Sequence, residues 1–434
     1  MTTFPLLRRV PDRLPTARVA PCMEPRLVRT RPDGAPLGLA GEQEAGYLQE
    51  TPTPASAAGL IDELTRARVQ GRGGAGFPAH VKWRSVAAAD GRRVVVANGH
   101  EGEPASGKDR WLLLHRPHLV LEGLLLAGAA LGADRTIVCV SRPDTRASVE
   151  AAIGDLAAAG LVQESVDIEV VSLDHRYVTG EESALVQGIN GKQPLPTFKP
   201  PRPFEEGVGG QPTLIQNVET LAHVAWIHRH GAEAFAQLGT RTSPGSALFT
   251  IMGGPEDCAI IEAPLGIEIH ELLSFVGVQP EAVSRLFLGG WFGGVHASEV
   301  LGLECDYTTL RLAGSGLGCA SLTVIGPDED VAGIVAELGA WYASESAQQC
   351  GVCRNGTRAI GKALGKNAEG LADDEDLANL SRWGVDLPGR GACAFLDGAA
   401  TLARTTVSVI SAKEFVGARA RAGNGATTTL EEQS

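Results

Sequence analysis

The sequence predicts a protein of three parts: an α/β domain with a parallel sheet, a small mixed sheet domain and a C-terminal helical region. Three observations support this division. Strand-like apolar runs alternate with helical segments from residue 60 to residue 230, the composition shifts near Thr240, and helical spacing returns at Val331. At 434 residues the chain is also too long for one ordinary hydrophobic core.

The first region alternates helix and strand. Residues 61–69 have helical spacing, and residues 94–97 form an apolar run that ends at Asn98-Gly99. Such a run is typical of a buried strand with a ligand loop at its carboxyl end. We expect further helices at 119–131, 147–159 and 217–230, and further strands at 136–140 and 166–173. This order favours a parallel sheet with right-handed crossovers.

After residue 194 the regular alternation of strand and helix is interrupted. Residues 194–212 are rich in Pro and Gly but carry Phe198 and Phe204, which favours a covering loop over a free linker. Short strands at 249–251, 259–263 and 286–288 with a helix at 269–276 fit a β-grasp (ubiquitin-like) sheet, and helices are expected at 331–343, 373–381 and 398–412. The expected divisions are an arm at 1–45, domains at 46–240, 241–327 and 328–415, and a polar tail at 416–434, disordered from Gly423.

Composition narrows the class of protein. The net charge of −13 argues against nucleic acid as a partner, and no apolar run is long enough to span a bilayer. The Arg- and Pro-rich arm lacks the apolar core of a secretory signal, so we expect a cytoplasmic chain and a disordered, loosely docked or partner-docking arm. The eight cysteines are scattered, which does not suggest a disulfide scaffold.

A glycine-rich turn follows the first helix. Glycines occupy positions 71, 73, 74 and 76, and Lys82 follows shortly after. Exposed N–H groups in such a loop can cradle a phosphate, because the missing Cβ atoms allow close approach. A tight turn alone would need only one or two of these glycines.

Two pairs of acids are candidate ligand groups. Glu101 and Glu103 follow the predicted strand at 94–97, where ligands gather in open α/β sheets, and Glu181-Glu182 follows Gly180. Their carboxylates can accept hydrogen bonds from sugar hydroxyl or carboxamide N–H groups. The alternatives are solvated loop acids for the first pair and acids that suit a helix dipole for the second.

Cys350-x2-Cys353 is followed forty residues later by Cys393. Thiolates are soft ligands suited to an iron–sulfur cluster or zinc, although three cysteines do not complete a four-thiolate site. The alternative is a set of buried loop cysteines without a metal.

Taken in order, these motifs resemble the family of NADH-binding flavoprotein subunits of respiratory complex I, which includes diaphorase subunits of NAD-reducing hydrogenases and formate dehydrogenases. The resemblance covers roughly residues 60–407. It rests on Gly71-Arg-Gly-Gly-Ala-Gly-Phe-Pro78 with Lys82-Trp83, Glu101-Gly-Glu-Pro104 with Lys108-Asp109-Arg110, Tyr177-x2-Gly180-Glu-Glu182, Lys199-Pro-Pro201, and Pro212-Thr213 with Asn217-Val-Glu-Thr220.

The resemblance implies an FMN-binding α/β domain, a β-grasp domain and a helical bundle with one 4Fe–4S cluster. It assigns no catalytic side chain. The residues implied to bind FMN are Gly71, Gly74, Lys82, Asn98, Gly180, Glu181, Asn217 and Thr220, and Arg72 and Glu101 are expected to bind a cofactor as well. Those implied to face the nicotinamide dinucleotide are Phe77, Glu103, Glu182 and Lys199, and those implied to bind iron are Cys350, Cys353 and Cys393.

The chain departs from the family pattern at several positions. An expected flavin-contacting Asp is His100, and the first residue of an Asn pair is Gln216. Two expected aromatic side chains are Ser85 and Arg202, of which Arg202 can stack on adenine or meet a 2′-phosphate. The dinucleotide is therefore written NAD(P)H.

The cluster motif has also lost its first ligand. The family pattern Cys-Gly-x-Cys-x2-Cys corresponds here to Ala347-Gln348-Gln349-Cys350-Gly-Val-Cys353. Three outcomes stay open: a 3Fe–4S cluster, a 4Fe–4S cluster with water or another side chain on one iron, or no cluster. Cys319 is a conceivable substitute.

Two hypotheses follow. In the first, the chain is a flavin-dependent NAD(P)H oxidoreductase subunit that passes electrons through FMN to a cluster or to a ferredoxin-like iron–sulfur partner, peripheral to a membrane complex. In the second, the chain has lost catalysis and is a docking scaffold in a redox complex.

Overall fold

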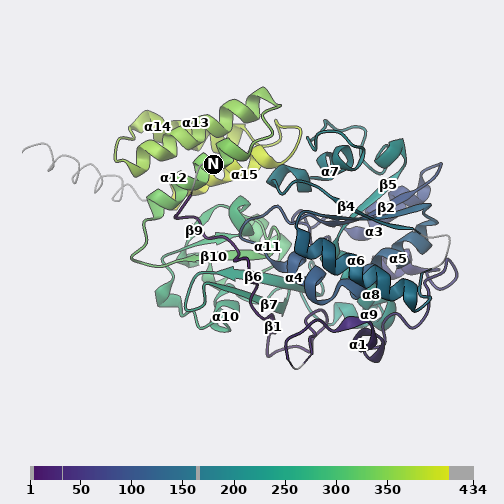
Figure 1. Ribbon diagram of the computed structural model, residues 1–434. Coiled ribbons are helices and arrows are strands. Elements are labelled where there is room, and N and C mark those ends of the chain that lie inside the picture. Colours follow the sequence, from purple (N-terminus) through teal and green to yellow (C-terminus); the bar gives the residue numbers. More distant parts are fainter. Residues whose placement is uncertain (1–3, 32, 163–166, 410–434) are drawn as a thin grey trace, which may run out of the picture.

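The computed structural model describes residues 4–31, 33–162 and 167–409. Two sheets and a helical bundle pack side by side, with the bundle over one end of the second sheet and beside the first domain (Figure 1). The expected tail at 416–434 lies outside the described residues, as does the end of the helix expected at 398–412. None of the described helices is long and apolar enough to cross a membrane.

The first sheet is parallel throughout, in the order β4-β3-β2-β5, as the strand–helix alternation predicts. Its central strand β2 is a buried run of valines whose side chains pack on both faces, where helices cover it. Its strands are β2 (Val94–Gly99), β3 (Arg135–Val140), β4 (Ile168–Ser172) and β5 (Thr213–Asn217). The helices of this domain are α1 (Gly38–Glu44), α2 (Leu60–Ala67), α3 (Ala79–Ala88), α4 (Lys108–His115), α5 (Pro117–Leu131), α6 (Pro143–Ala158), α7 (Glu182–Ile189), α8 (Val218–His230) and α9 (Ala232–Ala236).

The second sheet is mixed, in the order β1-β7-β6-β10-β8-β9. The hairpin of β6 and β7 is antiparallel, and the late strand β10 pairs parallel with β6 and antiparallel with β8. The elements are β1 (Arg18–Val19), β6 (Ser246–Met252), β7 (Cys258–Pro264), α10 (Ile269–Ser274), β8 (Arg285–Leu288), β9 (Val295–Ala297), α11 (Tyr307–Leu312) and β10 (Ser321–Ile325).

The helical region contains α12 (Val331–Glu345), α13 (Gly351–Ala368), α14 (Asp374–Asp386) and α15 (Phe395–Val409). α13 was not expected from the sequence, and it begins one residue after Cys350. Its apolar side chains pack with those of α12 and α15 into one core that also takes in Tyr177 of the first domain. The cysteine motif is therefore the start of a helix within a packed bundle.

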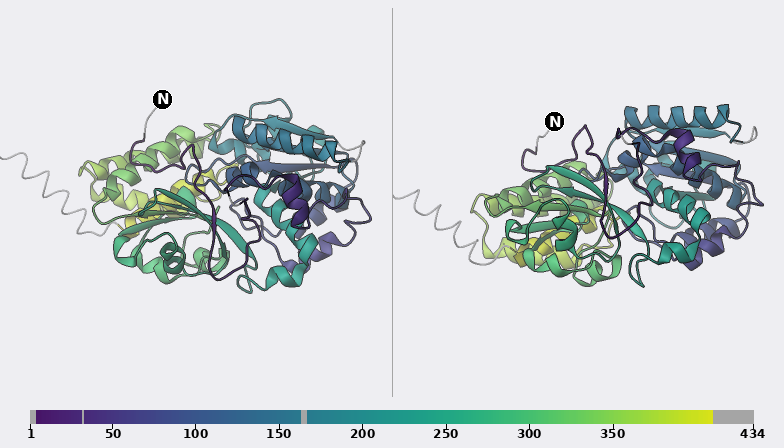
Figure 2. Two further views of the ribbon diagram at one scale, coloured as in Figure 1. Left: turned by 60° about the horizontal axis from the view of Figure 1, so that its bottom comes forward. Right: turned by 90° about the horizontal axis from the view of Figure 1, so that it is seen from below.

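The N-terminal arm is docked, so the prediction of a disordered or loosely docked arm is wrong. Figure 2 shows it running across both sheet domains, and β1 adds a parallel strand to β7. The guanidinium of Arg26 donates to the carbonyls of Phe235 and Ala234, and it lies 4.3 Å from the ring centroid of Trp226. The buried carboxylate of Glu262 accepts three backbone N–H groups of the arm, those of residues 26–28. These contacts bury polar groups in pairs, which composition alone could not reveal.

A cluster of buried charges joins the two sheet domains. Lys108 Nζ lies 2.8 Å from Glu219 Oε2 and 2.6 Å from Asp109 Oδ1, and the backbone N–H of Leu248 in β6 donates to Glu219 Oε1 at 2.9 Å. Burial favours the neutral carboxyl, but Lys108, His223 and Arg72 outweigh it and lower the pKa of Glu219 to about 2. Glu219 is thus held as an anion at the domain junction.

Replacing Arg26 by Ala should lower the free energy of unfolding by about 2–4 kcal/mol, because it leaves two buried carbonyls without their charged donor and removes the contact with Trp226. Urea unfolding measures the change. The matched control is Arg18→Ala, which removes an exposed ion pair with Glu256 and should cost less than about 1 kcal/mol. Equal urea midpoints for the two variants would show that Arg26 does not anchor the N-terminal arm.

The buried His223 should make the fold acid-sensitive. Burial lowers its pKa from 6.5 to about 4; Glu219 opposes this shift, and the positive charge of Arg72 adds to it. Because the folded pKa is depressed, the stabilisation is complete above pH 6.5 and is lost as the pH falls toward 4, by up to about 3 kcal/mol. Unfolding free energies measured between these pH values should fall less steeply in His223→Gln. An unchanged slope in that variant would rule His223 out as the cause.

Candidate flavin, nucleotide and iron–sulfur site

The glycine-rich loop lies between α2 and α3 and has free donors. The N–H groups of Gly73 and Gly76 have no hydrogen-bond acceptor among the described residues. A Cβ added at Gly73 would lie 3.4 Å from Cβ of Asn217, so the loop runs close beside the start of α8. Unpaired amides in a glycine turn suit a phosphate group, and this observation fits the phosphate of FMN.

The loop is held by its own backbone and by side chains from α8 and α11. The N–H of Gly71 donates to the carbonyl of Phe77, and the hydroxyl of Tyr307 donates to the carbonyl of Gly71. The backbone N–H of Arg72 donates to the hydroxyl of Thr220. The guanidinium of Arg72 is buried and donates to the carbonyls of Ser246 and Gln70, so it points away from the loop's open side.

Four predicted site residues from three separate motifs meet in one chain of ion pairs. Lys82 Nζ lies 3.0 Å from a carboxylate oxygen of Glu182, and Lys199 Nζ lies 2.7 Å from Glu181 and 3.2 Å from Glu182. Partial burial would raise the pKa of Glu182, but the two lysines outweigh it and lower that pKa. Glu182 is thus anionic, and the side chains of both acids are about a fifth to a quarter exposed. They can accept hydrogen bonds from a bound ligand.

Side chains at the ends of the parallel strands are partly engaged in holding the backbone. Asn98 donates from Nδ2 to the carbonyl of Gly180, and its Oδ1 accepts the N–H of His100. Asn217 accepts the first N–H groups of α8 and donates to Asp109. Glu181 caps α7 in the same way. The structure thereby brings β2, β5 and the start of α7 to one edge of the sheet.

The carboxylates of Glu101 and Glu103, which follow β2, are hydrogen-bonded to groups of the protein itself. The carboxylate of Glu101 accepts the hydroxyl of Ser106 and the N–H groups of Asp109 and Arg110 at the start of α4. The carboxylate of Glu103 accepts the N–H groups of Ala105 and Trp291, and burial raises its pKa to about 7. These contacts account for both side chains without a ligand.

His100 stands where the family pattern has an Asp. Its Nε2 lies 3.0 Å from the carbonyl of Asp174, and since a carbonyl only accepts, Nε2 carries the proton. Burial lowers the pKa of His100, which keeps the ring neutral. Nδ1 is then an acceptor; it is buried without a partner among the described residues, on the side of Gly180.

The side chains expected to clamp a nucleotide are mostly exposed. Phe77 is 46% exposed and available for stacking. Ser85 donates to the carbonyl of Val81 within α3, and the N–H of Arg202 donates to Glu205. Neither of the latter two supplies a ring, so this site has fewer stacking surfaces than the family pattern.

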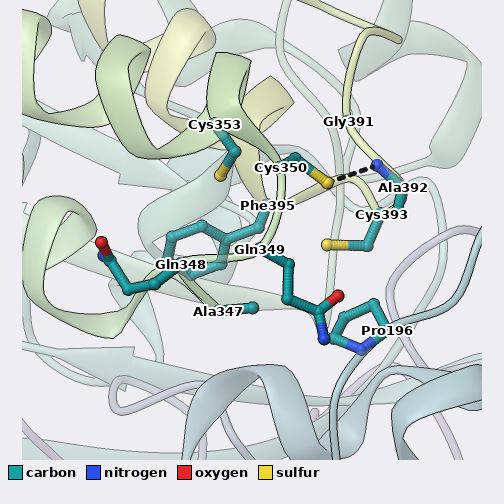
Figure 3. Close-up of a pocket in the computed structure, with 10 residues that line it drawn as sticks. All are labelled: Pro196, Ala347, Gln348, Gln349, Cys350, Cys353, Gly391, Ala392, Cys393 and Phe395. Carbon is teal, nitrogen blue, oxygen red and sulfur yellow. Dashed lines mark hydrogen bonds between the residues drawn. The ribbon is translucent and has the colours of Figure 1, made fainter.

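The three cysteines line one small cavity. Figure 3 shows the sulfur atoms of Cys350, Cys353 and Cys393 arranged around one space, with the methyl group of Ala347 in the wall. The backbone N–H of Ala392 donates to the sulfur of Cys350 at 3.5 Å. A gathered set of soft thiol ligands fits an iron–sulfur cluster.

No three His, Cys, Asp or Glu side chains in the described ranges are spaced to bind one metal ion. A cluster does not need that spacing, because each thiolate binds a different iron.

The cavity adjoins the first domain. Pro196, in the loop after α7, forms part of its wall. Phe395, also in the wall, lies 5.5 Å from the ring of Tyr177, which precedes Gly180 by three residues. Tyr177 and Phe292 are stacked at 4.3 Å. The sequence motif contained Tyr177 but gave it no role; its aromatic neighbours come from segments more than a hundred residues away.

Comparison with known proteins agrees with this geometry. The Nuo51 FMN-binding domain matches residues 64–226, and the NADH-ubiquinone oxidoreductase-F iron-sulfur binding region matches residues 333–413. The F subunit of the NADH-quinone oxidoreductase of Rickettsia felis is 31% identical over 357 residues, which cover 79% of this chain and 84% of that protein. The corresponding F 1 subunit of Rhizobium meliloti is 32% identical over 363 residues, covering 79% and 82%.

Solved structures agree as well. A chain of the NAD+-reducing NiFe hydrogenase in the H2-reduced state has a TM-score of 0.75 and 28% identity, with coverage of 90% of this chain and 72% of that chain. In the air-oxidised state the TM-score is 0.73 at 30% identity, with coverage of 84% of this chain and 65% of that one. The chain belongs to the family of F subunits of NADH-quinone oxidoreductase, which are NADH-dehydrogenase-type oxidoreductases that transfer electrons from NADH through FMN to an iron–sulfur cluster.

Proposed function

We propose that this chain is the electron-input subunit of a multi-subunit redox complex, and that its own residues hold NADH, FMN and a cluster in adjoining sites. The observation that carries the proposal is the meeting of Lys82, Glu181, Glu182 and Lys199 beside the glycine loop, next to the cysteine cavity. FMN accepts a hydride and releases electrons singly, and the cluster accepts them one at a time.

We assign the flavin phosphate to the free amides of the glycine loop at Gly73 and Gly76, with Lys82 as the nearby cation. Gly71 and Gly74 shape the turn, and Gly74 has φ of 114°, which side chains rarely allow. The edge formed by Asn98, Gly180 and Asn217 borders the rest of the flavin. His100 Nδ1 offers an uncharged acceptor where the family pattern has a carboxylate.

We assign the nucleotide to the exposed side of the ion-pair chain. Phe77 supplies a stacking surface, and Glu182 and Lys199 supply an acceptor and a donor. Glu103 lies behind this surface, and Glu101 and Arg72 act on the backbone. These three residues support the site from within the protein rather than by touching the ligand.

The finer organisation is also a proposal. The hairpin β6–β7, the helix α10, the antiparallel strands β8 and β9 and the inserted parallel strand β10 support a β-grasp fold for residues 241–327, between domains at 46–240 and 328–415. We propose a ferredoxin-like iron–sulfur subunit as the acceptor. We propose a cytoplasmic location, peripheral to a membrane complex.

Anaerobically purified protein should show a flavin spectrum over a broad iron–sulfur shoulder, and NADH should bleach it. NADPH, added to a second sample, tests whether Arg202 admits a 2′-phosphate. A flavin spectrum that neither nucleotide bleaches would favour the docking scaffold over the enzyme.

The substitution Gly73→Ala should weaken FMN binding by at least about tenfold, because the added methyl group fills the phosphate cradle. The protein should keep its melting temperature, since the new Cβ would lie at an ordinary 3.4 Å from Asn217. Quenching of flavin fluorescence on titration into apo-protein measures the affinity.

The control for this variant is Gly154→Ala in α6, where an added Cβ meets nothing within 4 Å. Equal FMN affinity in the two variants would exclude the glycine loop as the phosphate site.

A further inference from the structure

We propose that the cluster in this chain is held by three thiolates and keeps its fourth iron, and that this iron, at the Ala347 corner, takes an exchangeable small thiolate from solvent. The proposal deepens the proposed function and rests on it, because it assumes that the cysteine cavity holds a cluster. It selects one of the outcomes that the sequence left open.

The geometry leaves one corner without a ligand. Cys350, Cys353 and Cys393 come from the start of α13 and from the segment before α15, and Ala347 lines the same cavity from the turn after α12 (Figure 3). The family pattern has a cysteine at position 347. A methyl group there can neither coordinate iron nor fill the space of a thiolate.

The turn at this corner has nevertheless kept its bent form. Gln348 occupies the position of the family's glycine and has φ of 58°, in the left-handed region that glycine adopts readily. Its side chain donates to the carbonyl of Ala343 and accepts from Arg358, and its N–H donates to the hydroxyl of Ser346. These bonds offset the cost of the left-handed backbone. The chain therefore has a left-handed turn at the position of the family's glycine but no thiolate beside it.

No other side chain on the wall replaces the missing thiolate. Apart from the three cysteines, the described residues lining the cavity carry no thiol, imidazole or carboxylate; they are Pro196, Ala347, Gln348, Gln349, Gly391, Ala392 and Phe395. Cys319 is not among them, and its thiol is hydrogen-bonded with Ser106 near Glu103. The Cys319 substitute considered from the sequence is thus not favoured.

The open corner faces solvent. Gln348 and Gln349 are exposed, whereas Ser346 and Cys353 on the inner side are buried. A ligand from solution can therefore reach the fourth iron without unfolding the bundle. Iron–sulfur clusters prefer soft thiolate ligands, which favours a small thiol.

The step is a ligand exchange. The entering thiol forms a bond from sulfur to iron and gives its proton to solvent, and the ligand it displaces leaves to solvent. No electron is transferred.

The test uses the full chain, prepared without thiols, reconstituted anaerobically with iron and sulfide and reduced with dithionite. The electron paramagnetic resonance spectrum is recorded before and after adding 2-mercaptoethanol. Three proteins are compared: wild type, Ala347→Cys and Ala347→Ser. The serine variant is the matched control, because it changes the same atom position without supplying a thiolate.

We expect about four irons per chain in all three proteins. The spectra of wild type and Ala347→Ser should shift on addition of the thiol, whereas the spectrum of Ala347→Cys should not change. The thiol-treated wild type should approach the spectrum of Ala347→Cys.

Three irons per wild-type chain under iron excess would overturn the proposal in favour of a 3Fe–4S cluster. A wild-type spectrum that does not change when 2-mercaptoethanol is added would overturn the proposal as well. A cluster only in Ala347→Cys would show that three thiolates do not suffice. Flavin content and bleaching by NADH, measured on portions of the same preparations to which no dithionite is added, separate these results from failure of the proposed function, in which both would be missing.

Discussion

The buried carboxylate of Glu219 is the point at which the two sheet domains and three of the sequence motifs are tied together. Lys108 pairs with it from the start of α4, Arg72 approaches it from the glycine loop at 4.0 Å, and Leu248 of the second sheet donates its N–H. Removing one member of such a set leaves an unpaired buried charge, which costs several kcal/mol. The cluster fixes the position of the glycine loop relative to β6 and hence the floor of the proposed flavin site.

Several motif residues hold the backbone in place at the edge of the sheet where the ligand is proposed to bind. Glu101, Glu181 and Asn217 each accept the first N–H groups of a helix, and all three stand near the carboxyl edge of the parallel sheet. Capping these helices with side chains fixes where they begin. The amides of Gly73 and Gly76 have no such acceptor among the described residues, so they stay available for an external anion. Side chains therefore fix the starts of the helices, and the free backbone amides are left to bind the ligand.

The sequence predicted the parallel sheet and the buried helix α5, because these depend on local periodicity. It could not predict that Arg72 and Glu103 turn inward, since their partners Ser246 and Trp291 lie about 170 to 190 residues away. The docked arm was missed for the same reason: Arg26 and Glu262 are paired only in space. β10 was missed because its partner strand β6 is separated from it by the whole second domain.

At Ala347, hydrogen bonds hold the turn although the cysteine of the family pattern is missing. A turn with glycine at its bend needs little help, but the turn at Gln348 is held by Ala343, Ser346 and Arg358. One thiolate fewer makes the cluster and its ligands less negative by one charge, which stabilises the reduced form and raises the reduction potential. An entering thiolate restores that charge. On this proposal, the electron affinity of the site would depend on the thiols that the surrounding solution supplies.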